Sequence, residues 1–201
     1  MAVEILTETP VVPSSTLGPY RHADYLELPD EPRCELIYGR FYLMHSPALI
    51  HQIIASQLWL RLDAIAVVAG GLAVIAPMAV LLADHSTVEP DVTYVSAERL
   101  GIAKRWIEGV PDLIVEVLSP GTARRDRREK LRLYAESGVR EYWIVDPEVR
   151  QIEFLVASLG TAGRLEVALP DGDVYRSQVL PEIVLDLADF WREVECRTPL
   201  V

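Results

Sequence analysis

Two acidic residues that begin or interrupt apolar runs are the strongest candidates for chemistry in this sequence. Glu116 lies inside the run Asp112-Leu-Ile-Val-Glu-Val-Leu118, in which every other residue after Asp112 is apolar. Such a run predicts a central strand that is buried on both faces. A lone carboxylate in that position is unfavourable unless a cation, a metal ion or hydrogen bonds compensate it. Glu116 therefore needs a partner.

Two aspartates that follow prolines compete for this role. Asp112 lies four residues before Glu116 in the same strand, about 13 Å away in an extended chain, which is too far for one small cation to bridge. Asp91 begins a different strand after Pro90, and neighbouring strands lie only about 4.8 Å apart. Asp91 and Glu116 can therefore share a divalent cation, and their hard oxygen atoms suit Mg²⁺.

The elements that must position these residues alternate between strands and helices. Helices are predicted over 21–28, from Ser46 to about Val68 with Pro47 in the first turn, and over Thr122–Ser137 before Gly138. Strands are predicted at Cys34–Tyr38, Arg40–Met44, Leu72–Leu82, Asp91–Val95, Asp112–Leu118, Glu141–Val145, Gln151–Val156 and Leu165–Ala168. This order predicts an α/β fold with a mixed sheet. We expect a loose arm over residues 1–20 and a single domain over 21–201.

Composition limits the classes of protein to which the chain can belong. Its 201 residues are half apolar and carry a formal net charge of -11, which argues against non-specific binding of nucleic acid through the whole surface. Two cysteines form neither a metal-type spacing nor a disulfide framework. The N-terminus lacks the features of a signal peptide, so we expect a cytoplasmic protein. Residues 64–83 are uncharged, but Gly70, Gly71 and Pro77 favour a helix end, a turn and a buried strand over a membrane span.

One local basic stretch departs from this acidic character. Residues 124–132 contain six basic side chains and two acidic ones. Because the stretch begins just after the Glu116 strand, Arg124, Arg125 and Arg128 are candidates to contact a phosphate backbone. A solvated helix surface is the alternative interpretation.

Several stretches together resemble one family of proteins. They are Cys34-Glu-Leu-Ile-Tyr-Gly39, Ser46-Pro47 with His51, Glu89-Pro-Asp-Val92, Pro111–Pro120, Arg125-Asp-Arg-Arg-Glu-Lys130, Tyr134 and Gly138–Pro147. They cover roughly residues 25–190 in order, and they resemble the Uma2-like (DUF820) putative restriction endonucleases of the PD-(D/E)XK nuclease superfamily. The resemblance implies a restriction-endonuclease-like core in which a mixed sheet is flanked by helices.

The sequence departs from the superfamily pattern at Leu118, where a lysine is expected two positions after the glutamate. The resemblance implies that Lys130 on the following helix takes over this role. A helical wheel with Leu131, Tyr134 and Ala135 on the packing face puts Lys130 at its boundary, which permits the role without requiring it. An ordinary surface pair between Asp126 and Lys130 is the competing interpretation.

The resemblance also implies further site residues and an activity. It places Glu35 near the metal ion and His51 and Tyr134 at the lining of the site, with packing roles as the alternatives. The resulting prediction is an endonuclease that hydrolyses phosphodiester bonds of DNA with Mg²⁺, or Mn²⁺, held by Asp91, Glu116 and the Val117 carbonyl. By analogy we expect a homodimer. The alternatives are a nuclease-like binding module without turnover and, more weakly, a two-carboxylate glycosidase.

Overall fold

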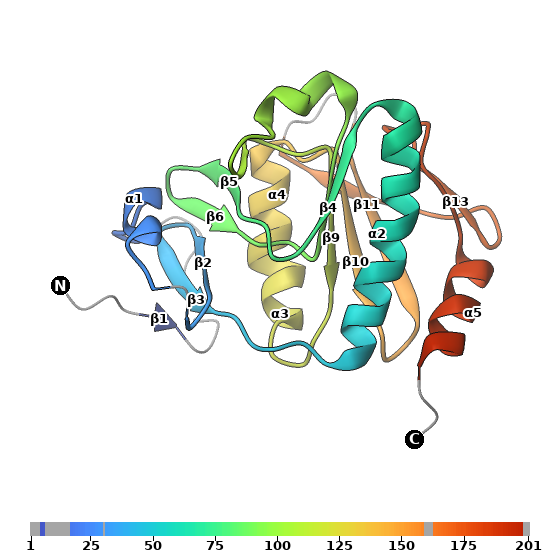
Figure 1. Cartoon of the computed structure of the whole chain (residues 1–201), viewed down its shortest axis with the longest axis horizontal. Helices are drawn as coiled ribbons and strands as arrows, with labels where there is room; N and C mark the ends of the chain where they lie inside the picture. The colour runs from blue at the N-terminus through green and yellow to red at the C-terminus, as the bar shows by residue number, and fades with distance from the viewer. Residues whose placement is uncertain (1–4, 7–16, 30, 159–162, 199–201) are drawn as a thin grey trace.

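The computed structural model describes residues 5–6, 17–29, 31–158 and 163–198, and it contains two six-stranded sheets (Figure 1). The larger sheet has the order β12-β11-β10-β9-β7-β4. Its strands are β4 Leu72–Ile75, β7 Val92–Val95, β9 Leu113–Val117, β10 Glu141–Asp146, β11 Gln151–Ala157 and β12 Leu165–Ala168. Only β9 and β10 run parallel among these neighbours. The predicted mixed α/β fold is therefore confirmed.

The second sheet is built largely from hairpins and has the order β1-β3-β2-β6-β5-β8. Its strands are β1 Ile5–Leu6, β2 Cys34–Ile37, β3 Arg40–Leu43, β5 Val80–Ala83, β6 Ser86–Val88 and β8 Ile107–Glu108. The predicted hairpin around Gly39 forms, with Cys34 opposite Leu43. The single strand predicted at 72–82 is wrong, because β4 and β5 belong to different sheets.

Helices cover both faces of the larger sheet (Figure 1). Helix α2 (Leu49–Ala69) lies on one face with α5 (Leu187–Arg197), and α3 (Ala123–Arg125), η2 (Asp126–Lys130) and α4 (Leu131–Ser137) follow one another on the other face. The remaining elements are α1 His22–Leu26, η1 Ala97–Ile102 and the β13 Val174–Arg176 and β14 Val184–Asp186 hairpin. Helix α2 begins two residues after Pro47, so the predicted place of that proline in the first turn is wrong.

Alternation along β9 explains how the sheet separates its two cores. Leu113, Val115 and Val117 pack in the core that also contains the buried face of α2. Ile114 packs in the core on the other side, together with Leu133 and Tyr134 of α4. Because side chains alternate across a strand, Glu116 points with Ile114 towards the η2–α4 side.

Two further sequence predictions concern the N-terminal arm and the uncharged segment. Most of the predicted arm lies outside the described residues, but Ile5 and Leu6 pair with Phe41 and Tyr42 of β3. The uncharged segment forms the expected end of α2 and a turn at Gly70 with φ of 74°, but β4 and β5 follow in place of the one strand expected. By length and composition α2 could cross a membrane, but this is weak evidence because the helix contacts β4, β7, β9 and α5.

Candidate nuclease site

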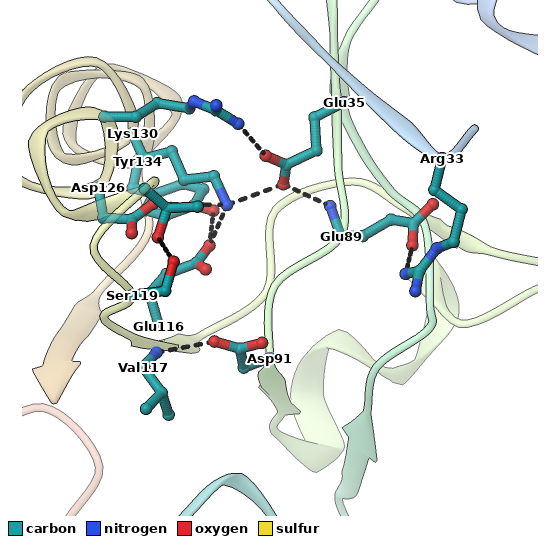
Figure 2. A network of polar contacts seen from close by, with 12 residues as sticks. Arg33, Glu35, Glu89, Asp91, Glu116, Val117, Ser119, Asp126, Lys130 and Tyr134 are labelled. Carbon is teal, nitrogen blue, oxygen red and sulfur yellow. Dashed lines mark hydrogen bonds and ion pairs between the residues drawn. The ribbon is translucent and has the colours of Figure 1, made fainter. Parts of the chain in front are cut away.

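The two predicted metal-binding carboxylates lie on neighbouring strands. The register Val92 opposite Val115 puts Asp91 next to Glu116 at one end of β7 and β9. Asp91 Oδ2 accepts a hydrogen bond of 2.7 Å from the Val117 amide. This hydrogen bond extends the contact between the two strands beyond the start of β7. It also fixes the Asp91 carboxylate beside the end of β9 (Figure 2).

Asp112 lies at the opposite end of β9 and has different partners. Its carboxylate accepts a hydrogen bond of 2.7 Å from the Ser96 amide and lies 3.1 Å from Arg140 Nη1. Arg99 Nε is 3.3 Å from the same carboxylate. These contacts fix the entry of β9, so Asp112 has the structural position that strand geometry indicates.

Lys130 lies inside a group of carboxylates rather than at the helix boundary (Figure 2). Its Nζ is 2.8 Å from Glu116 Oε1, 2.8 Å from Glu35 Oε1 and 3.8 Å from Asp126 Oδ1. Only 4% of the residue is exposed. Burial acts to lower the pKa of Lys130, but the surrounding carboxylates outweigh it and hold the pKa above its usual value. The side chain is therefore an ammonium, which cannot take a proton from a water molecule.

A π turn explains why the helical wheel misplaced this part of the helix. Residues Asp126–Lys130 form a π-helical segment between α3 and α4, and such segments shift the register of the residues before them relative to those after them. Of the residues expected on the packing face, Tyr134 and Ala135 are buried and Leu131 packs half-buried against the same core, but the buried face also includes Lys130 and Leu133. Asp126 and Lys130 are therefore not a surface pair.

Arg125 differs from its predicted position on the nucleic-acid-binding surface. Only 2% of Arg125 is exposed, its guanidinium lies over the Tyr42 ring, and Nη1 is 3.6 Å from Glu35 Oε2. Arg125 thus points inward, next to the Glu35 carboxylate. Arg124 and Arg128 do lie exposed, and neither makes an ion pair or hydrogen bond within the part of the chain that the structure describes.

Glu35, His51 and Tyr134 all reach the site from separate elements. Glu35 on β2 accepts a hydrogen bond of 3.0 Å from the Glu89 amide as well as contacting Lys130. Tyr134 donates a hydrogen bond of 2.6 Å to Glu116 Oε1. His51, in the first turn of α2, has Nε2 at 3.2 Å from Asp91 Oδ2. Burial acts to lower the pKa of His51, but Asp91 and the Val117 backbone outweigh it and raise the pKa.

The electrostatics of the site favour an additional cation. Glu35, Asp91, Glu116 and Asp126 bring four carboxylates towards two permanent cations, Lys130 and Arg125. Burial raises the pKa of Glu116 well above its usual range, although Lys130 opposes this, and burial raises the pKa of Asp126 to about 6. A divalent cation would favour the ionised form of both groups.

The oxygen atoms at the strand ends fit such a cation. Within the described residues, no three His, Cys, Asp or Glu side chains form a metal-binding group. Mg²⁺ needs fewer, because it keeps several waters and uses one or two carboxylates. Asp91 Oδ1 and Glu116 Oε2 accept no hydrogen bond from the described part of the chain, and both belong to carboxylates that face this end of β9.

Comparison with known proteins decides the family. A family model described as "Uma2: Putative restriction endonuclease" matches residues 22–188. The chain belongs to the Uma2 family. Membership gives it a nuclease-type function, which makes it a hydrolase. No curated protein matches the chain.

A solved structure supports the same fold for this Uma2 protein. The crystal structure of a putative nuclease belonging to DUF820 from Anabaena variabilis is similar, with a TM-score of 0.69 and 20% sequence identity. The similarity covers 88% of this chain and 99% of the other. It shows that the two proteins share a fold, and the predicted restriction-endonuclease-like core is confirmed.

Sequence reasoning missed Asp126 as a member of this Uma2 site. Asp126 is 1% exposed and lies close to Lys130. Its spacing of four residues before Lys130 was a signal, but the same spacing is common on exposed helix surfaces. Only the π turn and the burial of the helix distinguish the two cases.

Proposed function

We propose that this Uma2 protein is a divalent-cation-dependent endonuclease that hydrolyses phosphodiester bonds of DNA. The observation that carries the proposal is the position of Lys130, whose ammonium lies 2.8 Å from Glu116 although it comes from a helix and not from the strand. The presence of Leu118 in place of the lysine of the superfamily pattern is therefore compatible with activity. We further expect a homodimer, by analogy with enzymes that cut both strands.

The residues of the site have separate roles in this proposal. Asp91, Glu116 and the Val117 carbonyl would hold Mg²⁺ or Mn²⁺. When bound, such an ion activates water and stabilises charge on the phosphate. Lys130, a fixed positive charge, would stabilise charge that develops on the phosphate. Tyr134 and Lys130 orient Glu116 through their contacts to Oε1, and His51 orients Asp91 through its contact to Oδ2.

Plasmid nicking tests the proposal directly. We expect the purified protein to convert supercoiled DNA to open circles with Mg²⁺ or Mn²⁺, and to lose this activity when EDTA removes the ion. A structured RNA in a parallel reaction tests the choice of DNA. Cation-dependent stabilisation without cleavage of either substrate would favour the binding module instead.

Cation binding should also be visible as thermal stabilisation. Mg²⁺ at ten times its Kd should add about 1.4 kcal/mol to the free energy of unfolding, or roughly 3–6 °C in Tm for a protein of this size. The shift should disappear in Asp91→Asn, because this change removes a charged oxygen ligand. It should persist in the matched variant Asp63→Asn, which lies half-buried on α2 outside the site. An equal shift in both variants would place the cation elsewhere.

The exposed arginines should contribute to DNA binding through salt-sensitive contacts. We expect Arg124→Ala and Arg128→Ala each to reduce the slope of log Kobs against log salt concentration by about 1, because each removes one phosphate contact. Filter binding or fluorescence anisotropy at several salt concentrations measures the slope. Arg176→Ala on β13 is the control, because Arg176 is also exposed. A slope that changes equally in all three variants would exclude a specific role for the helix.

A further inference from the structure

Asp126, a member of the Lys130 cluster, has a hydrogen bond with the Thr122 side chain but leaves one of its carboxylate oxygens without such a partner. Its Oδ1 is buried without a hydrogen-bond partner in the described structure. The nearest cation, Lys130 Nζ, is 3.8 Å away, which is an ion pair but too long for a hydrogen bond. An unpaired buried carboxylate oxygen is costly, so its position beside the site calls for an explanation.

The contacts of Lys130 explain why Asp126 lies there. An ammonium group has three donors, and the two closest acceptors of Lys130 are Glu35 Oε1 and Glu116 Oε1, both at 2.8 Å. Asp126 Oδ1 is the third carboxylate oxygen in reach. Lys130 therefore has two strong partners and one looser partner in this arrangement.

The three carboxylates belong to different elements and have different further duties. Glu35 is fixed by the Glu89 amide and lies near Arg125. Glu116 lies beside Asp91 at the end of β9, where its remaining oxygen is available to a cation. Asp126 is on the same helix as Lys130 and lies in the π turn that ends at this lysine.

We propose that Asp126 is a positioning residue that holds the Lys130 ammonium at the site, together with Glu35, when Glu116 engages a divalent cation. This inference rests on the proposed function for the bound cation. The ion pair between Asp126 and Lys130 is formed by this chain alone. Asp126 acts through Lys130, and it contacts neither the substrate nor the reacting atoms. The π turn is what brings both residues to the buried face.

The presence of only two lysines, Lys104 and Lys130, makes the inference measurable without an activity assay. An amine-acylating reagent followed by peptide mass spectrometry reports the reactivity of each lysine. Lys104 is exposed and paired with Glu108 at 2.8 Å, so it provides an internal reference in every sample. We expect Lys130 to be protected from acylation in the folded protein, because it is buried and charged.

We expect Asp126→Asn to raise the acylation rate of Lys130, relative to that of Lys104, by about tenfold, because one of three negative charges around the ammonium is lost. Asp126→Glu should keep the protection, because it keeps the charge. Asp63→Asn on α2 is the matched control and should leave the ratio unchanged. Addition of MgCl₂ should raise Lys130 acylation further in Asp126→Asn, and should leave the wild-type protein protected.

The folded state of each variant is established first by circular dichroism and thermal unfolding. If Asp126→Asn does not fold, the smaller uncharged variant Asp126→Ser replaces it. A folded uncharged variant in which Lys130 is as protected as in the wild-type protein would overturn the inference.

Plasmid nicking distinguishes failure of this inference from failure of the proposed function. A wild-type protein that cleaves no DNA contradicts the nuclease proposal, whereas the acylation ratio still decides the role of Asp126. Where nicking occurs, kcat should fall in Asp126→Asn with little change in KM, and Asp126→Glu should restore it.

Discussion

Glu116→Gln should reduce DNA nicking by at least about 10³-fold, which corresponds to roughly 4 kcal/mol of transition-state stabilisation. The change keeps the size of the side chain but removes the charge that would bind a divalent cation beside Asp91. Lys130 keeps Glu35 at 2.8 Å and Asp126 at 3.8 Å, so the ammonium is not left alone. The fold should therefore survive, and loss of activity with a cooperative thermal transition is the expected result.

A second carboxylate in the same strand provides the control for this experiment. Asp112 also follows a proline, but it lies at the other end of β9 and contacts Arg99, Arg140 and the Ser96 amide. Asp112→Asn should lower stability and leave nicking intact at temperatures where the variant is folded. Equal nicking by Glu116→Gln and the wild-type protein would remove Glu116 from the active site. If Asp112→Asn alone lost activity, the metal-binding role proposed for Asp91 would belong to Asp112.

The strand framework of this site could be predicted from the sequence because its signals are local. An apolar run with a proline before it and Ser119-Pro120 after it predicts β9, and the spacing of strands then favours Asp91 over Asp112. The structure puts Asp91 beside Glu116, as expected. Glu35, His51 and Tyr134 also lie at the site, but their place there came from family resemblance, since nothing in their local sequence requires it.

The helix that carries Lys130 could not be predicted in the same detail. A wheel of 100° per residue assumes a regular helix, whereas the segment Asp126–Lys130 is a π turn. Sequence patterns do not locate such a turn, because its cost is compensated by tertiary contacts. Here those contacts are ion pairs to Glu35 and Glu116, which lie 95 and 14 residues away in the chain from Lys130. The burial of Arg125, which we expect from the sequence at the surface, and the burial of Asp126 could not be predicted either.

Lys130→Met should be the most destabilising single change at the site. Methionine has a similar length but leaves Glu35, Glu116 and Asp126 buried without their shared ammonium. Removal of one partner from a buried ion pair typically costs about 3–5 kcal/mol, because the remaining charge is uncompensated. We expect a loss of this size in the free energy of unfolding at pH 8, measured by urea denaturation. Lys104→Met is the matched control, and it should change stability by less than about 1 kcal/mol because Lys104 and Glu108 form an exposed pair.

The pH dependence of the same variant tests the cause of the loss. Burial already raises the pKa values of Glu116 and Asp126, the latter to about 6, while Lys130 acts to lower both. Without Lys130 both values rise further. A carboxyl whose folded-state pKa is raised contributes stability below its unfolded pKa, near 4, and loses it as the pH rises towards the folded value. The deficit of Lys130→Met should therefore be smaller at pH 5 than at pH 8, because the carboxyls can take up protons at the lower pH. MgCl₂ at pH 8 should restore part of the lost free energy of unfolding, since a divalent cation replaces the missing positive charge. A deficit that is the same at both pH values would mean that lost packing, and not uncompensated charge, is responsible.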